Sequence, residues 1–539
     1  MLRRTLLQTL AAPFLLSAAP RELAADAVIV GAGVGGCAAA LAALRNGLRV
    51  ILTEETDWIG GQLTAQAVPP DEHQWIEQFG STRAYRDYRN AVRDFYRRHY
   101  PLTADAMRRP NLNPGDGSVS RLTHEPRVSL AVLEAMLAPY ASSGQLTLLL
   151  EHKPVSADVS GDRIRAVSVR SLGSFTRILS APYFLDATEQ GDLLPLTKTE
   201  FVTGFESQRE TAEPHAPSEA QPANIQSFTV CFAIDYKPGE DHTIDKPEQY
   251  AFWRDYVPDL KPAWTGKLLS WAMTDPQSLK SRSVWFSSDP AAPGQPGLNL
   301  WLYRRILSAA NFTPGFASDI SLVNWPQNDY WLGNLHGVSD EDAARHLHAA
   351  KQLSLSLLYW MQTNQGFKGL RLRHDITGTE DGLAKYPYIR ESRRILAEFT
   401  VLEQHVAAAS RPTGIAEKFP DSVGVGSYRI DLHPTSAGDN YIDVASVPFQ
   451  IPMGALIPRR VDNLLAAAKN LGVTHITNGC YRLHPVEWNI GESAGALAAE
   501  AIATKRSPSA IRANAKSLEA FQKKLTADGI ELAWPLAPR

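Results

Sequence analysis

Short apolar runs and one alanine-rich run alternate near the start of the chain. Residues 26–30 read DAVIV and residues 48–53 read LRVILT. Uninterrupted apolar runs of this length are typical of strands that are buried on both faces of a parallel sheet. Between them, residues 37–46 are rich in alanine and leucine, which favours a helix. The order of these segments predicts a strand–helix–strand unit.

A glycine-rich turn joins the first strand to the helix, with the sequence GAGVGG at residues 31–36. Gly31 permits a tight turn, Gly33 lets a diphosphate approach the backbone, and Gly36 lets the helix pack on the strand. The helix N-terminus offers unpaired N–H groups to the phosphates. Glu54 ends the second strand and can accept hydrogen bonds from a ribose diol. The unit therefore predicts a dinucleotide site that favours a ribose 2′-hydroxyl over a 2′-phosphate.

The pattern changes further along the chain. Alternating positions within residues 156–179 predict an antiparallel meander. From Thr203 to about Asn440 the strand–helix rhythm vanishes, which indicates a second domain. A long helix is expected at residues 340–362, capped by Ser339. The predicted organisation is an N-terminal segment, two parts of a nucleotide-binding domain that flank a substrate domain, and a C-terminal tail, at residues 1–25, 26–200 with 441–505, 201–440 and 506–539.

A basic face is expected on the helix that contains Arg83 to Arg97. Its five arginines are spaced three or four residues apart, so they share one side of the helix. We expect this side to face solvent; the alternative is an electropositive rim that attracts an anionic substrate.

Composition narrows the function classes. The net charge is −3, which gives no indication of a nucleic-acid surface. Three cysteines, none close to another in sequence, exclude a disulfide framework and a CxxC motif. The GxSxG and HExxH motifs are also absent, so the sequence gives no support for a serine hydrolase or a zinc enzyme, and no metal site is expected.

The first 25 residues are typical of an export signal. Arg3 and Arg4 precede an apolar stretch from Thr5 to Ala19, and small residues follow at Ala24 and Ala25. The paired arginines resemble a twin-arginine signal, and the alternative is a disordered or weakly helical arm. We expect a periplasmic or secreted protein. The apolar stretch is too short to span a bilayer, so no stable membrane span is expected.

Four later segments extend the pattern of the glycine turn. They read WIGGQLT at 58–64, FLDATEQGD at 184–192, DNLLAAAKN at 462–470 and NIGESAGALAAE at 489–500. With the opening turn, they resemble the glutathione-reductase-type FAD-dependent oxidoreductases. The chain is most similar to a bacterial family of FAD-dependent oxidoreductases, some of whose members carry a xanthan lyase label.

The resemblance implies an α/β fold. Its parts are a Rossmann-type FAD-binding domain, with a parallel sheet and a β-meander, and an inserted mixed α+β substrate domain. It implies FAD as the cofactor, with a helix opening at Gly491 that directs its N–H groups at the flavin C2 carbonyl. Lys469 departs from the family's usual Gly followed by Asp or Arg, and it would add positive charge near the flavin. The residues that the resemblance places around FAD are Gly31, Gly33, Gly36, Glu54, Gly61, Gln62, Leu63, Val155, Ala187, Thr188, Gly191, Lys469, Asn489, Gly491, Glu492, Ser493 and Ala494.

The catalytic candidates come from segments that pass the flavin edge in the family. His475 and His484 are the candidates for a general base, because neutral imidazole titrates near working pH. Arg482 and Arg390 are candidates for holding a carboxylate or an oxyanion.

The expected function is oxidation of a C–H bond next to oxygen or nitrogen in a small polar or sugar-like molecule. Hydride would pass to flavin N5, and oxygen, a quinone or a redox partner would reoxidise the flavin. The alternative is a secreted polysaccharide-binding or lyase-like protein in which FAD is structural.

Overall fold

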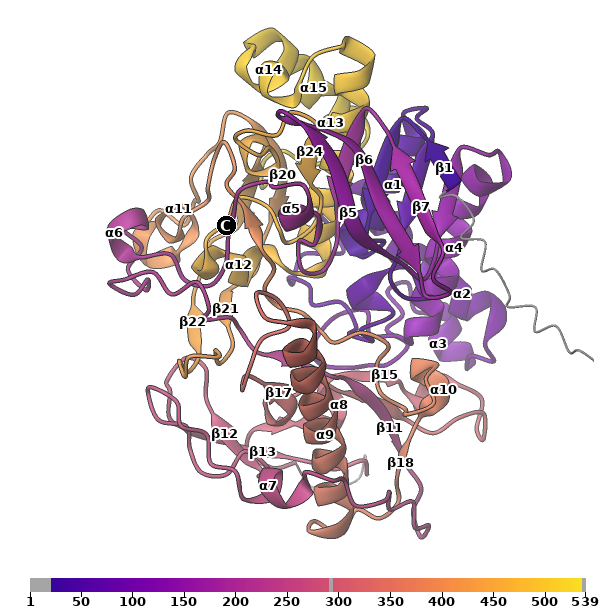
Figure 1. Ribbon diagram of the computed structural model, residues 1–539. Coiled ribbons are helices and arrows are strands. Elements are labelled where there is room, and N and C mark those ends of the chain that lie inside the picture. Colours follow the sequence, from indigo (N-terminus) through magenta and orange to yellow (C-terminus); the bar gives the residue numbers. More distant parts are fainter. Residues whose placement is uncertain (1–20, 290–293, 536–539) are drawn as a thin grey trace, which may run out of the picture.

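A five-stranded parallel sheet organises the first domain of the computed structural model, which describes residues 21–289 and 294–535 (Figure 1). All neighbouring pairs are parallel, and Val30 at the end of β2 lies level with Thr53 and Asp186. Every residue of β2 is fully buried, as its uninterrupted apolar sequence predicts. The predicted parallel sheet is confirmed. The strands lie in the order β24 (Leu464–Ala466), β8 (Tyr183–Asp186), β2 (Ala27–Val30), β3 (Val50–Thr53) and β4 (Leu146–Leu149).

Two helices pack against one another beside this sheet. They are α1 (Val34–Arg45) and α13 (His484–Thr504). An added Cβ at Gly491 would overlap the carbonyl oxygen of Gly35, and one at Gly495 would overlap that of Ala39. The two backbones approach this closely because glycines lie at the contact.

The β-meander is confirmed and has a fourth strand. β5 (His152–Ser160), β6 (Arg163–Ser171) and β7 (Thr176–Ser180) are antiparallel, and β1 (Arg21–Ala24) adds parallel to β7. β1 lies within the segment that the sequence analysis assigned to an export signal; residues 1–20 of that segment lie outside the described residues. The folded domain therefore includes residues from Arg21 onward.

A second hydrophobic core forms the inserted domain, in the lower half of Figure 1. Its main sheet has the order β15 (Arg305–Leu307), β16 (Ile320–Val323), β11 (Phe232–Tyr236) and β18 (Leu370–Leu372). The predicted long helix is α9 (Asp340–Thr363), and the Ser339 side chain accepts from the N–H of Asp342, as expected. Three tryptophans of this domain are almost fully buried and serve as core anchors: Trp253, Trp301 and Trp325.

The two cores do not follow the predicted boundaries throughout. Ile395, Val423 and Leu432 were assigned to the substrate domain, but they pack in the first core. The C-terminal segment is also part of that core. It contains α14 (Pro508–Ala513) and α15 (Ala515–Ala527), and Phe521 and Leu525 of α15 are fully buried.

The basic face of α2 (Arg83–His99) is only partly exposed, which corrects the expectation of a solvated side. Arg89 and Arg93 are almost fully buried. Arg89 forms two-pronged ion pairs with Glu72 and Glu77, and Arg93 shares Glu77. Carboxylates from the loop before the helix compensate these charges, so this side holds the loop rather than facing water.

The other described elements are short apart from α4. The helices are α3 (Ala104–Arg108), α4 (Pro126–Ser142), α5 (Leu193–Leu196), α6 (Gln208–Thr211), α7 (Tyr250–Asp255), α8 (Leu300–Tyr303), α10 (His374–Thr377), α11 (Glu403–Val406) and α12 (His475–Tyr481). The strands are β9 (Phe201–Val202), β10 (Phe228–Thr229), β12 (Ala272–Thr274), β13 (Ser281–Trp285), β14 (Leu298–Asn299), β17 (Asp329–Tyr330), β19 (Arg394–Ile395), β20 (Ser422–Gly426), β21 (Ile430–Leu432), β22 (Ile442–Val444) and β23 (Phe449–Pro452).

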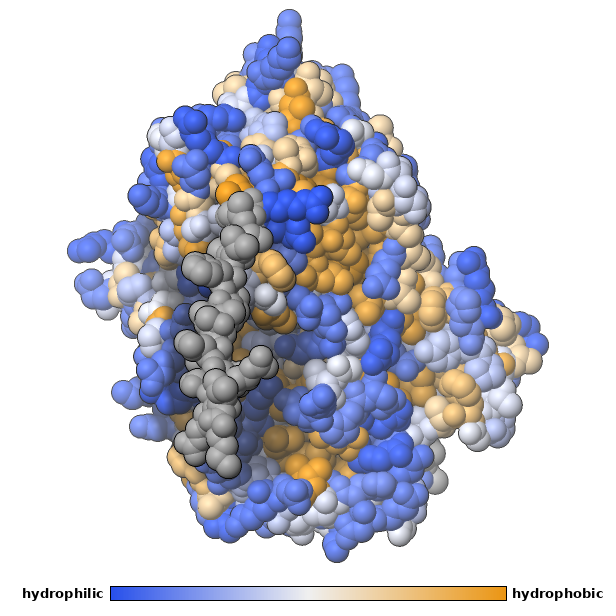
Figure 2. Space-filling view, turned by 45° about the vertical axis from the view of Figure 1, so that its right-hand side comes forward, coloured by the Kyte–Doolittle hydropathy of each residue, from blue (hydrophilic) through white to orange (hydrophobic). Residues whose placement is uncertain are grey.

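The molecular surface is mixed in character. On the face shown in Figure 2, hydrophobic residues gather mainly in the upper half, at the height of the first domain in Figure 1. Within residues 21–289 and 294–535, no helix combines the length and the apolar character needed to cross a bilayer.

Candidate functional site

A cleft of about 450 Å³ opens at the carboxyl ends of β2, β3 and β8. This is where open α/β sheets bind nucleotides. Gly31 has a φ of +93°, a conformation that favours glycine, and an added Cβ there would overlap the Ala187 carbonyl. An added Cβ at Gly36 would overlap the carbonyl of Gly31. The predicted residues that line the cleft are Gly31, Gly33, Glu54, Gly61, Ala187 and Thr188.

Glu54 lies in the wall of this cleft, as predicted for a ribose ligand. Its Oε2 accepts from the N–H of Ala32 at 3.0 Å, and its Oε1 accepts from the N–H and hydroxyl of Thr56 at 2.9 Å each. Burial raises the pKa of Glu54 to about 7, although these donors favour the ionised form. Oε2 keeps capacity to accept a further hydrogen bond from a diol.

The loop that contains Gly61, Gln62 and Leu63 forms a 3₁₀ turn, η1 (Gly61–Leu63), beside the cleft. The Gln62 amide donates to the carbonyl of Arg482 at 3.1 Å and to Glu487 Oε2 at 2.5 Å. Gln66 is fully buried and lines the cleft, and neither atom of its amide has a hydrogen-bond partner within the described structure. A buried amide without partners is costly, so this wall is suited to a polar ligand.

Lys469 brings a positive charge to this region, as the sequence predicts. Its side chain is fully buried, forms an ion pair with Glu189 and lies 3.7 Å from Glu487 Oε2. Burial lowers the pKa of Lys469, but the two glutamates outweigh this effect and raise it. The Glu189 Oε1 lies against Gly33 and Gly61 and has no partner among the described residues.

The predicted helix opening at Gly491 is wrong. α13 begins at His484, with Pro485 in its first turn, so the N–H groups of residues 491–494 lie inside the helix. Inside a helix these groups bond to preceding carbonyls and are not free for a ligand. The side chains have structural partners: Glu492 pairs with Arg45, while Asn489 and Ser493 bond to the backbone of β20. Gly491 and Ala494 are fully packed.

Two further predicted cofactor residues lie at the edge of the cleft. Val155 is at a bulge of β5, and its neighbours His152 and Pro154 line the cleft. Gly191, with φ +67°, lies in the turn after β8, and this turn is held by Asp186. Their roles toward a cofactor stay predictions.

A second cavity, of about 950 Å³, is lined by residues from both hydrophobic cores. Arg390 and Arg482 line it, as does Arg304, which the sequence analysis missed. Each guanidinium is at least nine-tenths buried and has a carboxylate partner. The pairs are Arg304 with Asp71, Arg390 with Asp329, and Arg482 with Asp431.

Tyr388 connects two of these guanidiniums. Arg390 lies over its ring at 5.0 Å, and Arg482 donates to its hydroxyl at 3.0 Å. Burial raises the pKa of Tyr388, so the hydroxyl stays protonated. Tyr388 therefore brings the two candidate arginines close together, and their predicted role toward a carboxylate or an oxyanion stays a prediction.

His433 is the histidine that lines this cavity. Its Nδ1 lies 2.6 Å from Asp329 Oδ2, and its Nε2 lies 3.5 Å from Asp431 Oδ2. The imidazole thus joins the Arg390–Asp329 pair to the Arg482–Asp431 pair. Its ring is therefore held between two carboxylates and is placed in the lining of the cavity.

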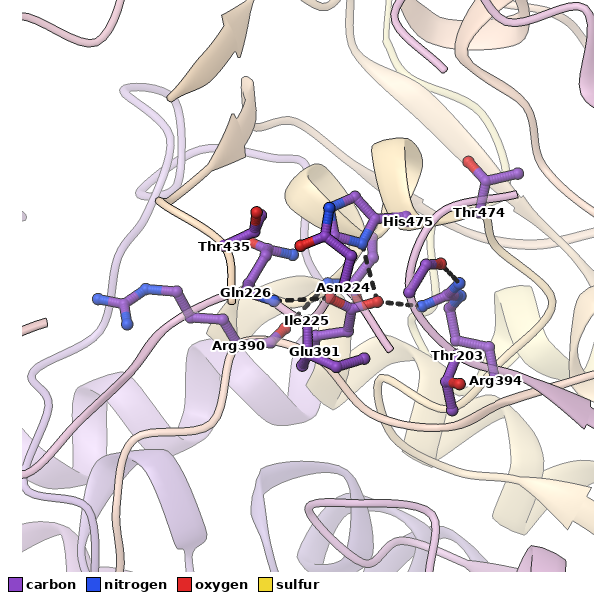
Figure 3. A network of polar contacts seen from close by, with 12 residues as sticks. Thr203, Asn224, Ile225, Gln226, Arg390, Glu391, Arg394, Thr435, Thr474 and His475 are labelled. Atoms are coloured by element: carbon purple, nitrogen blue, oxygen red, sulfur yellow. Dashed lines mark hydrogen bonds and ion pairs between the residues drawn. The ribbon is translucent and has the colours of Figure 1, made fainter. Parts of the chain in front are cut away.

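His475 and His484 are fully buried and are absent from the linings of both cavities. His475 Nδ1 lies 2.9 Å from Glu391 Oε1 (Figure 3). The ring of His475 also stacks on Phe205. Figure 3 shows the Arg390 side chain pointing away from this network. Interaction with His475 and Arg394 lowers the pKa of Glu391 to about 2 against the effect of burial.

His484 lies behind the second cavity. Its Nδ1 accepts from the N–H of Asp71 at 3.1 Å. Burial lowers its pKa to about 3, and the charges of Arg304 and Arg482 act in the same direction. The ring is therefore neutral at working pH and a weak base. The catalytic roles of His475 and His484 stay predictions.

One sequence signal for His433 was available. The triplet Leu-His-Pro occurs at 432–434 as well as at 483–485, each time after an acidic or basic residue, Asp431 or Arg482. Arg304 and Asp329 carry no comparable local signal, since their roles depend on contacts with distant segments.

The same segments of the chain supply lining residues to both cavities. Ala65 and Gln66 line the first cavity and Asp71 lines the second. Likewise, Tyr386 lines the first cavity and Tyr388 lines the second. The Gln62 side chain donates to the backbone of Arg482, which lines the second cavity. Within the described residues, no cluster of ligating side chains is suited to a metal ion.

The parallel sheet, the glycine turn and a glutamate at the end of the second strand are typical of a dinucleotide-binding protein. A family model described as FAD dependent oxidoreductase matches residues 26–525. The chain belongs to this family of FAD-dependent oxidoreductases. Its cofactor is therefore FAD.

Solved structures give weaker likenesses. A quinol fumarate reductase subunit from E. coli is 12% identical, with 94% of this chain and 74% of that chain covered and a TM-score of 0.34. An anhydrotetracycline hydroxylase from Streptomyces rimosus is 12% identical, with 94% and 66% covered and a TM-score of 0.32. A glycerol-3-phosphate dehydrogenase from Bacillus halodurans, complexed with FAD, is 14% identical, with 41% of each chain covered and a TM-score of 0.23.

The family assignment rests on the family model, because these TM-scores are low. No curated protein matches the chain. Neither the family description nor these three structures names a lyase.

The residues of the first cleft fit FAD. The unpartnered Gln66 amide and the glycines at 31, 33 and 61 leave polar atoms and open backbone for a dinucleotide. Glu189 is the exception, because its carboxylate lies against Gly33, where a diphosphate would approach. Lys469 compensates that charge.

Proposed function

We propose that this protein oxidises a C–H bond next to oxygen or nitrogen in a small polar molecule bound in the second cavity. FAD, when bound, accepts the hydride at N5. The protein's residues orient the substrate and take its proton. The observation that carries this proposal is that two segments, residues 65–71 and 386–390, contribute lining residues to both cavities.

His433 is the proposed proton acceptor. It lines the cavity, whereas the two histidines expected from the sequence do not. Asp329 orients its ring through the 2.6 Å contact to Nδ1, and both aspartates stabilise the imidazolium that forms. Arg390 shares Asp329 and keeps that carboxylate ionised, since it lowers the pKa of Asp329 against the effect of burial.

The protein is proposed to work after export. The basic and apolar start of the chain supports this, and twin-arginine export suits a protein that folds around FAD before it crosses a membrane. Oxygen, a quinone or a redox protein is the proposed electron acceptor.

Anaerobic flavin bleaching tests the proposal. A panel of small polar molecules is mixed with the purified holoprotein, and the flavin absorbance is followed over time. His433→Gln is expected to slow bleaching about 10²–10⁴-fold without loss of FAD, which is the usual contribution of a general base. His475→Gln and His484→Gln are the matched comparisons and are expected to change the rate less.

Two outcomes would contradict the proposal. If His433→Gln bleaches like the parent protein, His433 is not the base. If the flavin never bleaches while the protein binds or cleaves a glycan, the alternative with a structural FAD is correct.

A further inference from the structure

The second cavity has a surplus of hydrogen-bond donors. Among the residues that line it, five buried donor atoms have no partner within the described structure: Arg304 Nε, Asn324 Nδ2, Trp325 Nε1, Arg390 Nε and Arg482 Nε. The Tyr441 hydroxyl, which both donates and accepts, is the one other unpartnered buried atom of this lining. Within the described structure, no carboxylate or carbonyl oxygen of a lining side chain is both buried and without a hydrogen-bond partner.

The guanidinium groups of Arg304, Arg390 and Arg482 have more N–H donors than hydrogen-bond partners. A guanidinium carries five N–H donors. Arg304 bonds to Asp71 alone within the described residues, at 3.3–3.4 Å, and Arg482 bonds to Tyr388 and Asp431. Arg390 donates to Ser227, Thr229 and Asp329. Each group therefore has N–H donors left over.

Each carboxylate that lines the cavity already receives an arginine. Asp71 receives Arg304, Asp431 receives Arg482 and Asp443 receives Arg429. A neutral polyol brings a donor with every acceptor, and an ammonium group brings only donors. A carboxylate brings acceptors alone and matches the planar fork of a guanidinium.

We infer that the cavity binds a hydroxy acid, whose carboxylate is held by the cluster of Arg304, Arg390 and Arg482. This rests on the proposed function for the location of the substrate, and it adds the substrate class. The hydroxyl-bearing carbon would then lie in the part of the cavity that His433 lines.

Binding of matched pairs tests the substrate class without turnover. The probes are D-gluconate against D-glucitol, and L-lactate against propane-1,2-diol and L-alanine. Isothermal titration calorimetry on the holoprotein measures each affinity. We expect the hydroxy acid to bind at least about tenfold more tightly than its partner in one of the pairs, as expected for a charge-assisted hydrogen bond.

Variants connect the preference to the arginine cluster. Replacing Arg304→Gln together with Asp71→Asn removes an ion pair without leaving a buried unpaired charge, and it is expected to abolish the preference. Asn324→Ala keeps all three ion pairs and is expected to reduce it. Arg345→Gln with Asp342→Asn makes the same changes at an exposed pair on α9 and is expected to leave it intact.

Each outcome decides the inference. Equal or weaker binding of both hydroxy acids, including no binding of any probe, overturns it, as does a preference that survives the Arg304 and Asn324 variants. Flavin bleaching is read on the same samples. A hydroxy acid that binds without bleaching the flavin would contradict the proposed function and leave the carboxylate site standing.

Discussion

Glu54 is the residue predicted to bind the adenosine ribose of FAD. Its carboxyl is buried and its pKa is raised to about 7, so it changes charge within the working range. Ribose hydroxyls donate to the ionised form, and FAD binding therefore favours loss of the proton. By linkage, FAD affinity is expected to rise with pH up to about 7 and to level off above it.

Titration of the cofactor-free protein with FAD between pH 5.5 and 8.5, followed by flavin fluorescence, measures this dependence. Glu54→Gln is expected to weaken binding by about 1–3 kcal/mol and to flatten the pH profile. Glu55→Gln is the neighbouring control, and FMN, which lacks the adenosine ribose, is expected to show no response to the Glu54 change. An unchanged pH profile in Glu54→Gln would assign the titration to another group.

Residues that act through local sequence were predictable, and those that act through distant contacts were not. The glycine turn and Glu54 belong to one strand–helix–strand unit, so their spacing gave their positions. His433 depends on Asp329 and Asp431, which come from β17 and β21, and no local pattern links these segments. Arg390 and Arg482 were found because a family resemblance, rather than spacing, pointed to their segments.

Helix α13 is an element whose start was predicted wrongly from its local sequence. Its small residues between 491 and 499 mark the contact with α1, and they were interpreted as a helix start. The true start was signalled by Pro485 at the first turn, a position that proline favours. A glycine in a helix thus indicated close packing instead of a helix N-terminus directed at the flavin.

The contact of α13 with α1 gives a prediction at this scale. Gly491→Ala places a Cβ onto the Gly35 carbonyl, so the helices must separate or the backbone must shift. We expect a loss of about 1–3 kcal/mol in the free energy of unfolding, together with weaker FAD retention, because Gly35 belongs to the phosphate-binding turn. Urea unfolding and FAD content measure the two effects. Gly294→Ala, where an added Cβ contacts nothing within 4 Å, is the control and is expected to change neither.

At the scale of the whole molecule, the fold class was predictable, but the packing of distant segments into one core was not. Strand–helix alternation gave the parallel sheet, and polar alternation gave the meander. Hydrophobic residues within 395–432 and in the C-terminal helices pack in the first core, as do Ile306 and Leu322 of the inserted sheet. Such packing joins segments that are distant along the chain, and composition alone does not show it.

The pairing of strand β1 with β7 limits the position at which an export signal could be cleaved. Its four residues pair with β7 at the edge of the meander, and this ladder is lost if the mature chain begins at residue 26. A chain that begins at Arg21 is expected to match the full-length protein in thermal unfolding. One that begins at Asp26 exposes the edge of β7 and is expected to lose about 1 kcal/mol, or roughly 1 °C in Tm for a chain of this length. N-terminal sequencing of the exported protein should accordingly find its first residue at or before Arg21. Equal Tm values for the two shortened chains would show that β1 is dispensable and would allow cleavage at residue 25.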